Sequence, residues 1–76
     1  MKSRMLKQGQ AFLIQGFEQD AQMVWQQKMA SMGFVQGQRV DILRVLSWMG
    51  LVICHVMGST LILRTKEMAW LHLKQL

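Results

Sequence analysis

The 76-residue sequence has no proline, a single cysteine and only four acidic residues. Because it also has no stretch rich in glycine or serine, no linker is visible, and we expect one domain over residues 1–76. The single cysteine cannot form an internal disulfide, which is typical of a protein in the reducing cytosol. No apolar run approaches the ~20 residues that cross a bilayer, and no apolar core of a signal peptide follows the basic N-terminus. We therefore expect a cytoplasmic protein without a transmembrane segment.

The residues that are present are strongly apolar and basic: 51% are hydrophobic, and the net charge is +5. The apolar share is ample for a core and argues against a disordered chain. The positive charge fits nucleic acid, an anionic membrane surface or an acidic protein as a partner. The basic residues are scattered except for Lys2, Arg4 and Lys7, so we interpret the charge first as a contribution to solubility.

Stretches of alternating apolar side chains, bounded by glycines, predict a small β protein. The predicted strands cover residues 9–16, 38–46, 51–57, 60–64 and 70–76. One helix over 21–32 follows the first strand, with Asp20 as its N-cap and Gly33 at the left-handed C′ position. Residues 65–69 are expected to form one helical turn. Because short strands curl to remove exposed edges, we predict a mainly β, SH3-like barrel of about five strands, with an OB-like barrel as the alternative.

The alternation also predicts turns and faces. Gly58 and Ser59 form a two-residue hairpin signal, and a switch of the apolar positions to Leu43 and Val45 indicates a β-bulge. Lys28 lies near the middle of the apolar side of the helix, where its methylenes can pack while its ammonium reaches solvent. The side chains expected to share an apolar face are Phe12 and Ile14; Ala21, Val24, Trp25, Met29 and Met32; Val40 and Ile42; Val52, Cys54 and Val56; Leu61 and Leu63; and Leu71 and Leu73.

A longer pattern runs from Gly9 to Leu73. It comprises Lys28-Met29-x-x-Met32-Gly33, then Val56-x-Gly58-x-x-Leu61-Ile62-Leu63-Arg64, then Glu67-Met68-x-x-Leu71-x-Leu73. In this order and spacing the chain resembles the FeoA family, small cytoplasmic accessory proteins of bacterial ferrous iron uptake. The chain departs from the family in having Gln36 where proline is common and Met68 where a small residue is frequent. Met29 and Met32 replace leucines, which conserves volume.

The resemblance implies an SH3-like barrel that acts with a FeoB-type permease, a membrane protein that moves ferrous iron and carries a cytoplasmic GTP-binding domain. The family member is expected to be a regulator or adaptor on the cytoplasmic side, peripheral to the inner face of the inner membrane. A similar barrel also occurs in iron-dependent repressors, so the fold alone does not fix the role.

Metal and catalytic sites are not predicted. Cys54 and His55 are adjacent on a strand and therefore point to opposite faces, and no Cys-x-x-Cys or His-x-x-x-His spacing occurs. We interpret Cys54 as a core residue, and His55 and His72 as surface or edge residues. No catalytic motif is present, so we expect neither an enzyme nor a cofactor. The other ligand candidates considered are Glu18, Asp20, Asp41 and Glu67, and the methionines expected to fill the core or form a compliant contact surface are Met23, Met29, Met32, Met57 and Met68.

Protein binding is the remaining function. Trp48 and Met49 lie in a predicted loop, where an exposed aromatic side chain is a typical anchor; alternatively, Trp48 folds back over the open end of the barrel. Trp70 is expected to be half-buried. The candidate contact residues for the permease are Trp48, Met49, Arg44, Arg64 and Lys66.

Two other functions stay open. A nucleic-acid-binding barrel fits the positive charge, but the strands lack the interleaved aromatic and basic residues that stack on bases. A homo-oligomer that acts as a scaffold or gate fits the high apolar share, since a small domain then has apolar surface to spare.

Overall fold

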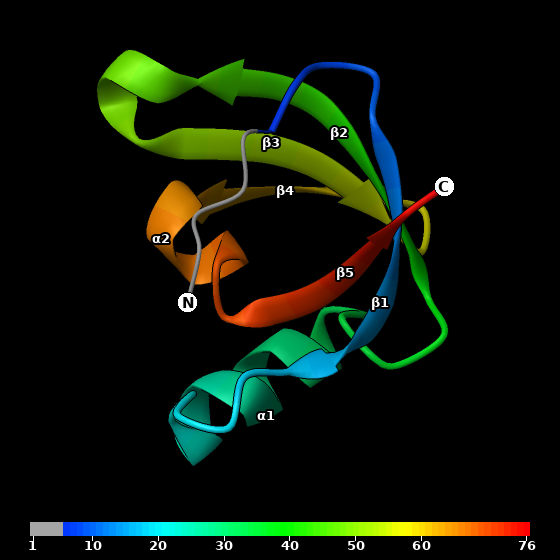
Figure 1. Ribbon diagram of the computed structural model, residues 1–76, viewed down its shortest axis with the longest axis vertical. Helices are drawn as coiled ribbons and strands as arrows, with labels where there is room; N and C mark the ends of the chain where they lie inside the picture. Colours follow the sequence, from blue (N-terminus) through cyan, green and yellow to red (C-terminus); the bar gives the residue numbers. More distant parts are fainter. Residues whose placement is uncertain (1–5) are drawn as a thin grey trace.

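The computed structural model describes residues 6–76 (Figure 1). Five strands, two α-helices and one short 3₁₀ helix follow one another along the chain. They are β1 (Ala11–Phe17), α1 (Met23–Ser31), β2 (Arg39–Leu46), η1 (Ser47–Met49), β3 (Leu51–Val56), β4 (Ser59–Arg64), α2 (Thr65–Met68) and β5 (Leu71–Gln75). Lys2 and Arg4 of the basic N-terminal group lie outside the described residues.

The five strands form one antiparallel sheet in the order β4-β3-β2-β1-β5. The strands curve strongly, so the sheet wraps around the core like a barrel, but β4 and β5 stay unpaired with each other (Figure 1). The helical turn α2 connects these two edge strands, and α1 lies beside β1 and β5. The prediction of a mainly β, SH3-like barrel with one helix after the first strand is confirmed.

The concave side of the sheet holds one apolar core. Every second residue of β3 is buried, as expected for a strand with one face inward. The core consists of Phe12, Ile14, Ala21, Trp25, Met29, Phe34, Val40, Ile42, Val52, Cys54, Val56, Leu63, Met68, Leu71 and Leu73. Leu61 and Trp70 are partly buried against it. The predicted strand faces are therefore largely confirmed.

The predicted bulge is present in β2. Ile42 pairs with Cys54 and Arg44 pairs with Ile53, so Leu43 is the extra residue between two successive pairs. Leu43 is exposed, whereas Val45 is partly buried against the core. After the bulge, Val45 faces the core and Leu43 does not, so the expectation that both residues share the apolar face is wrong. The bulge turns Arg44 to the convex side of the sheet.

The helix differs from its prediction at its start and on one side. It begins at Met23 rather than Ala21, and Asp20 is not its N-cap. The chain instead makes a turn in which Ala21 N donates to Glu18 O at 3.0 Å, which buries Ala21 ahead of the helix. The helix buries only Trp25 and Met29, while Val24 is 77% exposed.

Other residues of this segment also differ in their exposure. Lys28 is exposed. Met23 is exposed as well, which leaves the contact-surface alternative for this residue, whereas Met32 is partly buried against the core. Gly33 ends the helix with a φ of +102°, as predicted, since a residue without Cβ adopts this conformation readily.

The hairpin turn is displaced by one residue from its prediction. Val56 pairs with Ser59, so the two turn residues are Met57 and Gly58, and Ser59 already belongs to β4. Their φ values of +50° and +79° are both positive, as in a type I′ turn.

Candidate protein-binding surface

The convex side of β2, β3 and β4 carries an exposed apolar stripe. The strand register places Arg44, Ile53 and Ile62 in one row across the three strands. The next row contains Leu46, Leu51 and Arg64. Ile62 is 63% exposed, and both arginines are exposed. The two β3 residues of these rows, Leu51 and Ile53, are half-buried. This surface therefore presents aliphatic side chains with a cation at each side.

The 3₁₀ helix η1 extends this stripe at the end of β2 and β3. Trp48 is 83% exposed and Met49 is 50% exposed. Gly50 closes the turn with a φ of +66°, and its N–H donates to Ser47 O at 3.1 Å. The interpretation in which Trp48 folds back over the barrel is therefore wrong. We call Arg44, Trp48, Met49, Ile53, Ile62 and Arg64 the Trp48 face.

The predicted contact residues come from four elements but gather at one end of the sheet. Arg64 occupies the row next to that of Arg44, and Trp48 and Met49 follow directly on the strand end. Thr65 N donates to Gly50 O at 2.9 Å, which holds the start of α2, and with it Lys66, beside η1. Ile62 is not among the predicted contact residues, although the inward assignment of its two neighbours in β4 already implies its outward position.

Among residues 6–76, no ion pair joins a carboxylate to the cations of the Trp48 face, Arg44 and Arg64, or to the neighbouring Lys66. Within residues 6–76, Arg39 forms an ion pair with Asp41 at 2.9 Å, and His72 Nε2 lies at hydrogen-bond distance from Glu18 Oε2. Neither pair uses Arg44, Arg64 or Lys66. These three charges can therefore meet acidic groups of a partner without first breaking an internal ion pair.

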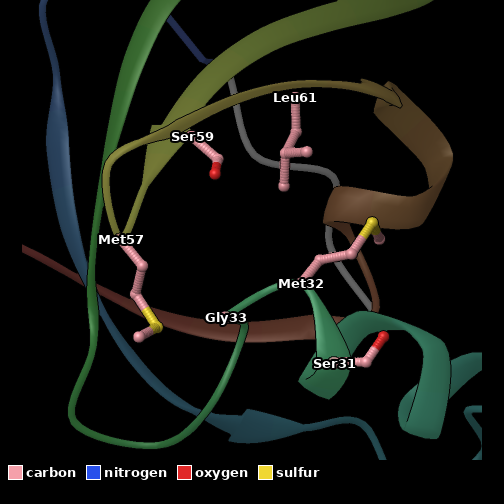
Figure 2. A pocket seen from close by; sticks show the side chains of 6 residues that line it. All are labelled: Ser31, Met32, Gly33, Met57, Ser59 and Leu61. Atoms are coloured by element: carbon pink, nitrogen blue, oxygen red, sulfur yellow. The ribbon is translucent and has the colours of Figure 1, made fainter.

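A hollow lies at the edge strand β4, apart from the Trp48 indole (Figure 2). It is an open groove of about 390 Å³ between β4 and the C-terminal end of α1. Sequence reasoning missed it, because its two sides lie far apart in the chain. Its lining residues are Ser31, Met32, Gly33, Met57, Ser59 and Leu61. We call it the β4 groove.

Glu67 has a structural role. Its Oε2 accepts a hydrogen bond from Trp25 Nε1 at 3.0 Å, and its Oε1 accepts one from Arg64 N at 3.0 Å. The indole of Trp25 also packs edge-on against the rings of Trp70 and Phe17, at centroid distances of 5.0 and 5.5 Å. Glu67 thereby joins α1 to α2 and is not available as a ligand.

The other candidate ligands are dispersed. Cys54 is fully buried, and this burial raises the pKa of its thiol to about 11. His55 points to the opposite face, where its Nδ1 lies 3.4 Å from Thr60 Oγ1. Across residues 6–76, no three His, Cys, Asp or Glu side chains gather as a metal site would require. The described helices include none with the length and apolarity to cross a membrane.

Comparison with known proteins identifies the family of this chain. A family model described as the FeoA domain matches residues 4–72 of the 76-residue chain. No curated protein matches the chain. The matched range takes in all five strands and both helices except for the last residues of β5. The chain therefore belongs to the FeoA domain family, whose members have an accessory role in ferrous iron transport.

Proposed function

We propose that this protein binds the cytoplasmic GTP-binding domain of a FeoB-type ferrous iron permease through the Trp48 face and regulates transport. Family membership supports the accessory role, and the FeoA domain is not known as an enzyme family. The cytoplasmic location follows from the proposed partner. We expect the partner to present a pocket for the Trp48 indole, with carboxylates at its rim.

The observation that carries the proposal is the exposure of Trp48 at the end of the sheet where Arg44, Arg64 and Lys66 lie, three cations that form no ion pair within residues 6–76. An 83%-exposed indole brings a large apolar area to an interface and loses little conformational entropy on binding. The neighbouring Met49 and Ile62 extend this apolar area, and methionine adapts its shape to an irregular partner. Arg44, Arg64 and Lys66 match an acidic surface and steer its approach.

Nucleic acid fits this surface less well than protein does. The strand positions of the Trp48 face are occupied by isoleucine and arginine, whereas single-stranded nucleic acid needs aromatic rings on which successive bases stack. Aliphatic side chains between arginines suit the mixed apolar and acidic surface of a protein instead.

Calorimetric titration of the protein with the permease's soluble GTP-binding domain tests the proposal. We expect Trp48→Ala to weaken binding by about 2 kcal/mol or more. Arg44→Glu should also weaken binding, and its effect should grow as the salt concentration is lowered. Val24→Ala is the matched control, because Val24 is 77% exposed on α1 and lies outside the Trp48 face. Equal affinities of the wild type, Trp48→Ala and Arg44→Glu would contradict the proposal, as would the absence of binding with and without GTP.

A further inference from the structure

We propose that β4 accepts an extended segment of a partner protein as a sixth strand, with alternate side chains of that segment in the β4 groove. This site is separate from the Trp48 indole and does not depend on the permease being the partner. The proposal combines three features of the edge: free main-chain groups, the apolar groove beside them, and an unusual backbone conformation at Met57.

The free main-chain groups follow from the hairpin register. Because Val56 and Ser59 flank a two-residue turn, they exchange hydrogen bonds with each other. In an antiparallel ladder, the main-chain groups of alternate residues then point toward β3, so those of Thr60 and Ile62 point away from it. The hydrogen bond from Arg64 N to Glu67 Oε1 agrees with this alternation, because the main-chain N–H of Arg64, two residues after Ile62, also points away from β3.

No strand covers this edge among residues 6–76. The sheet ends at β4, and no main-chain hydrogen bond outside the β3–β4 ladder involves Thr60 or Ile62. Unpaired donors and acceptors at strand spacing match another extended polypeptide and no other common ligand. Natural proteins commonly protect such an edge with lysine, proline or a bulge. Within β4 itself, residues 59–64 contain no lysine or proline, and their pairing with β3 has no register shift.

The β4 groove supplies the side-chain part of the site. Leu61, Met32 and Met57 give it apolar walls, and the hydroxyl-bearing Ser31 and Ser59 lie at its rim (Figure 2). Side chains alternate along a strand, so an added strand would place every second side chain in the groove and the others on the convex side near Ile62. The segment should therefore carry apolar residues at alternate positions.

Met57 supports a binding role for the groove. Its φ of +50° makes it the only non-glycine residue with a positive φ among residues 6–76. Asparagine or glycine adopts this turn position at lower conformational cost, so methionine lowers stability there. Its side chain is nevertheless 63% exposed at the groove. A strained residue with an exposed, adaptable side chain is typical of a contact site.

The edge also indicates the occupant. A second copy pairing through its own β4 would bring Leu61 to the groove, but its Leu63 is buried in its own core and its Ser59 is small. One leucine underfills a groove of about 390 Å³. A separate segment can place two apolar side chains there, and the exposed Arg64 and Lys66 favour an acidic residue at the adjacent end.

The test selects from random dodecapeptides displayed on phage, with the whole chain as the target. Selected peptides are then synthesised and added to the isotope-labelled protein. We expect alternating apolar sequences, and slowed hydrogen exchange at the Thr60 and Ile62 amides when they bind. N-methylation of the peptide residues whose N–H groups face β4 should weaken binding about tenfold. N-methylation of the residues between them, whose N–H groups point away from β4, should leave binding unchanged.

Two protein variants separate the main-chain edge of β4 from the Trp48 indole. The side chain of Ile62 also belongs to the Trp48 face, but Ile62→Pro removes an outward main-chain N–H that β3 does not use and should weaken peptide binding about tenfold. Trp48→Ala should leave peptide binding unchanged. The amide-exchange measurement uses the wild type and so does not depend on the folding of Ile62→Pro. Failure to select alternating peptides, or unchanged exchange at Thr60 and Ile62 in the complex, would overturn the proposal. Protection that appears without peptide and grows with protein concentration would instead identify a second copy as the occupant.

Discussion

Trp25 and Glu67 are joined by a 3.0 Å hydrogen bond from the indole Nε1 to Oε2, although 42 residues separate them in the chain. Trp25 is the main buried residue of α1 together with Met29, and Glu67 belongs to the turn α2 between the two edge strands. Because Oε1 of the same carboxylate accepts from Arg64 N, one side chain fixes both the helix and the end of β4. Glu67 thus links α1 to the end of β4.

Glu67→Ala is expected to lower the free energy of unfolding by about 1–3 kcal/mol. It leaves the part-buried indole N–H of Trp25 without its acceptor, and an unpaired polar group is costly when water cannot replace the partner. The Arg64 amide also loses its acceptor, but this bond is exposed and water can replace it. Urea denaturation of the variant measures the change. Glu18→Ala is the matched control, because Glu18 pairs with an exposed histidine and its loss should change stability by less than about 1 kcal/mol. Equal effects of the two substitutions would show that the Glu67 hydrogen bonds contribute no special stability.

Gly33→Ala is expected to destabilise the protein by about 1–3 kcal/mol. A φ of +102° is strained for any residue with a Cβ, and the added atom would lie 2.9 Å from Met57 Sδ. Gly37→Ala separates the two causes, since Gly37 has a φ of +89° and open space around its Cβ position. Thermal unfolding of both variants should show the larger loss for Gly33→Ala. A loss no larger than that of Gly37→Ala would mean that Met57 moves aside without penalty.

Met57→Asn is expected to raise the free energy of unfolding by about 0.5–1 kcal/mol, because asparagine is favoured at the first position of a type I′ turn. The same substitution removes an apolar wall of the β4 groove and should weaken the binding of alternating peptides. Denaturation and peptide titration on one preparation test both effects. A variant that is less stable than the wild type would remove the argument that methionine is retained there for contact.

Burial of Cys54 makes the stability of the protein depend on pH in the alkaline range. Its thiol is protonated up to a pKa of about 11 in the folded state, whereas the unfolded chain ionises near the ordinary value of 9.0. Because the folded state then binds more protons, stability is full below pH 9 and falls as pH rises toward 11, by roughly 2 kcal/mol. Cys54→Ala should show a shallower loss over this range. Parallel pH profiles of the two proteins would contradict the assignment, as would rapid alkylation of folded Cys54 at pH 8.

Period-two alternation was enough to predict the strands, because a sheet with one buried face forces apolar residues to every second position. It also located the bulge between Ile42 and Arg44. The start of α1 could not be predicted in the same way. Asp20 is a favourable N-cap in isolation, but the turn from Glu18 to Ala21 competes with that local preference and delays the helix to Met23. The boundary is therefore set by this competing turn and by the burial of Ala21 in the core.

The candidate site was only partly predictable. The exposure of Trp48 was one of two alternatives, since sequence alone does not say whether a loop side chain returns to the core. The displaced hairpin turn depends on Met57 adopting a positive φ, which residue preferences disfavour. The β4 groove depends on residues 31–33 meeting residues 57–61, and that proximity arises from the curl of the sheet rather than from any local pattern.

Chemical-shift mapping of the labelled protein with the permease's soluble GTP-binding domain tests the central claim most directly. The account predicts that the largest changes fall on Trp48, Met49, Arg44, Arg64 and Lys66, and that Trp48→Ala abolishes them while Val24→Ala does not. Shifts confined to α1 or β5, or an unchanged spectrum with and without GTP, would contradict it.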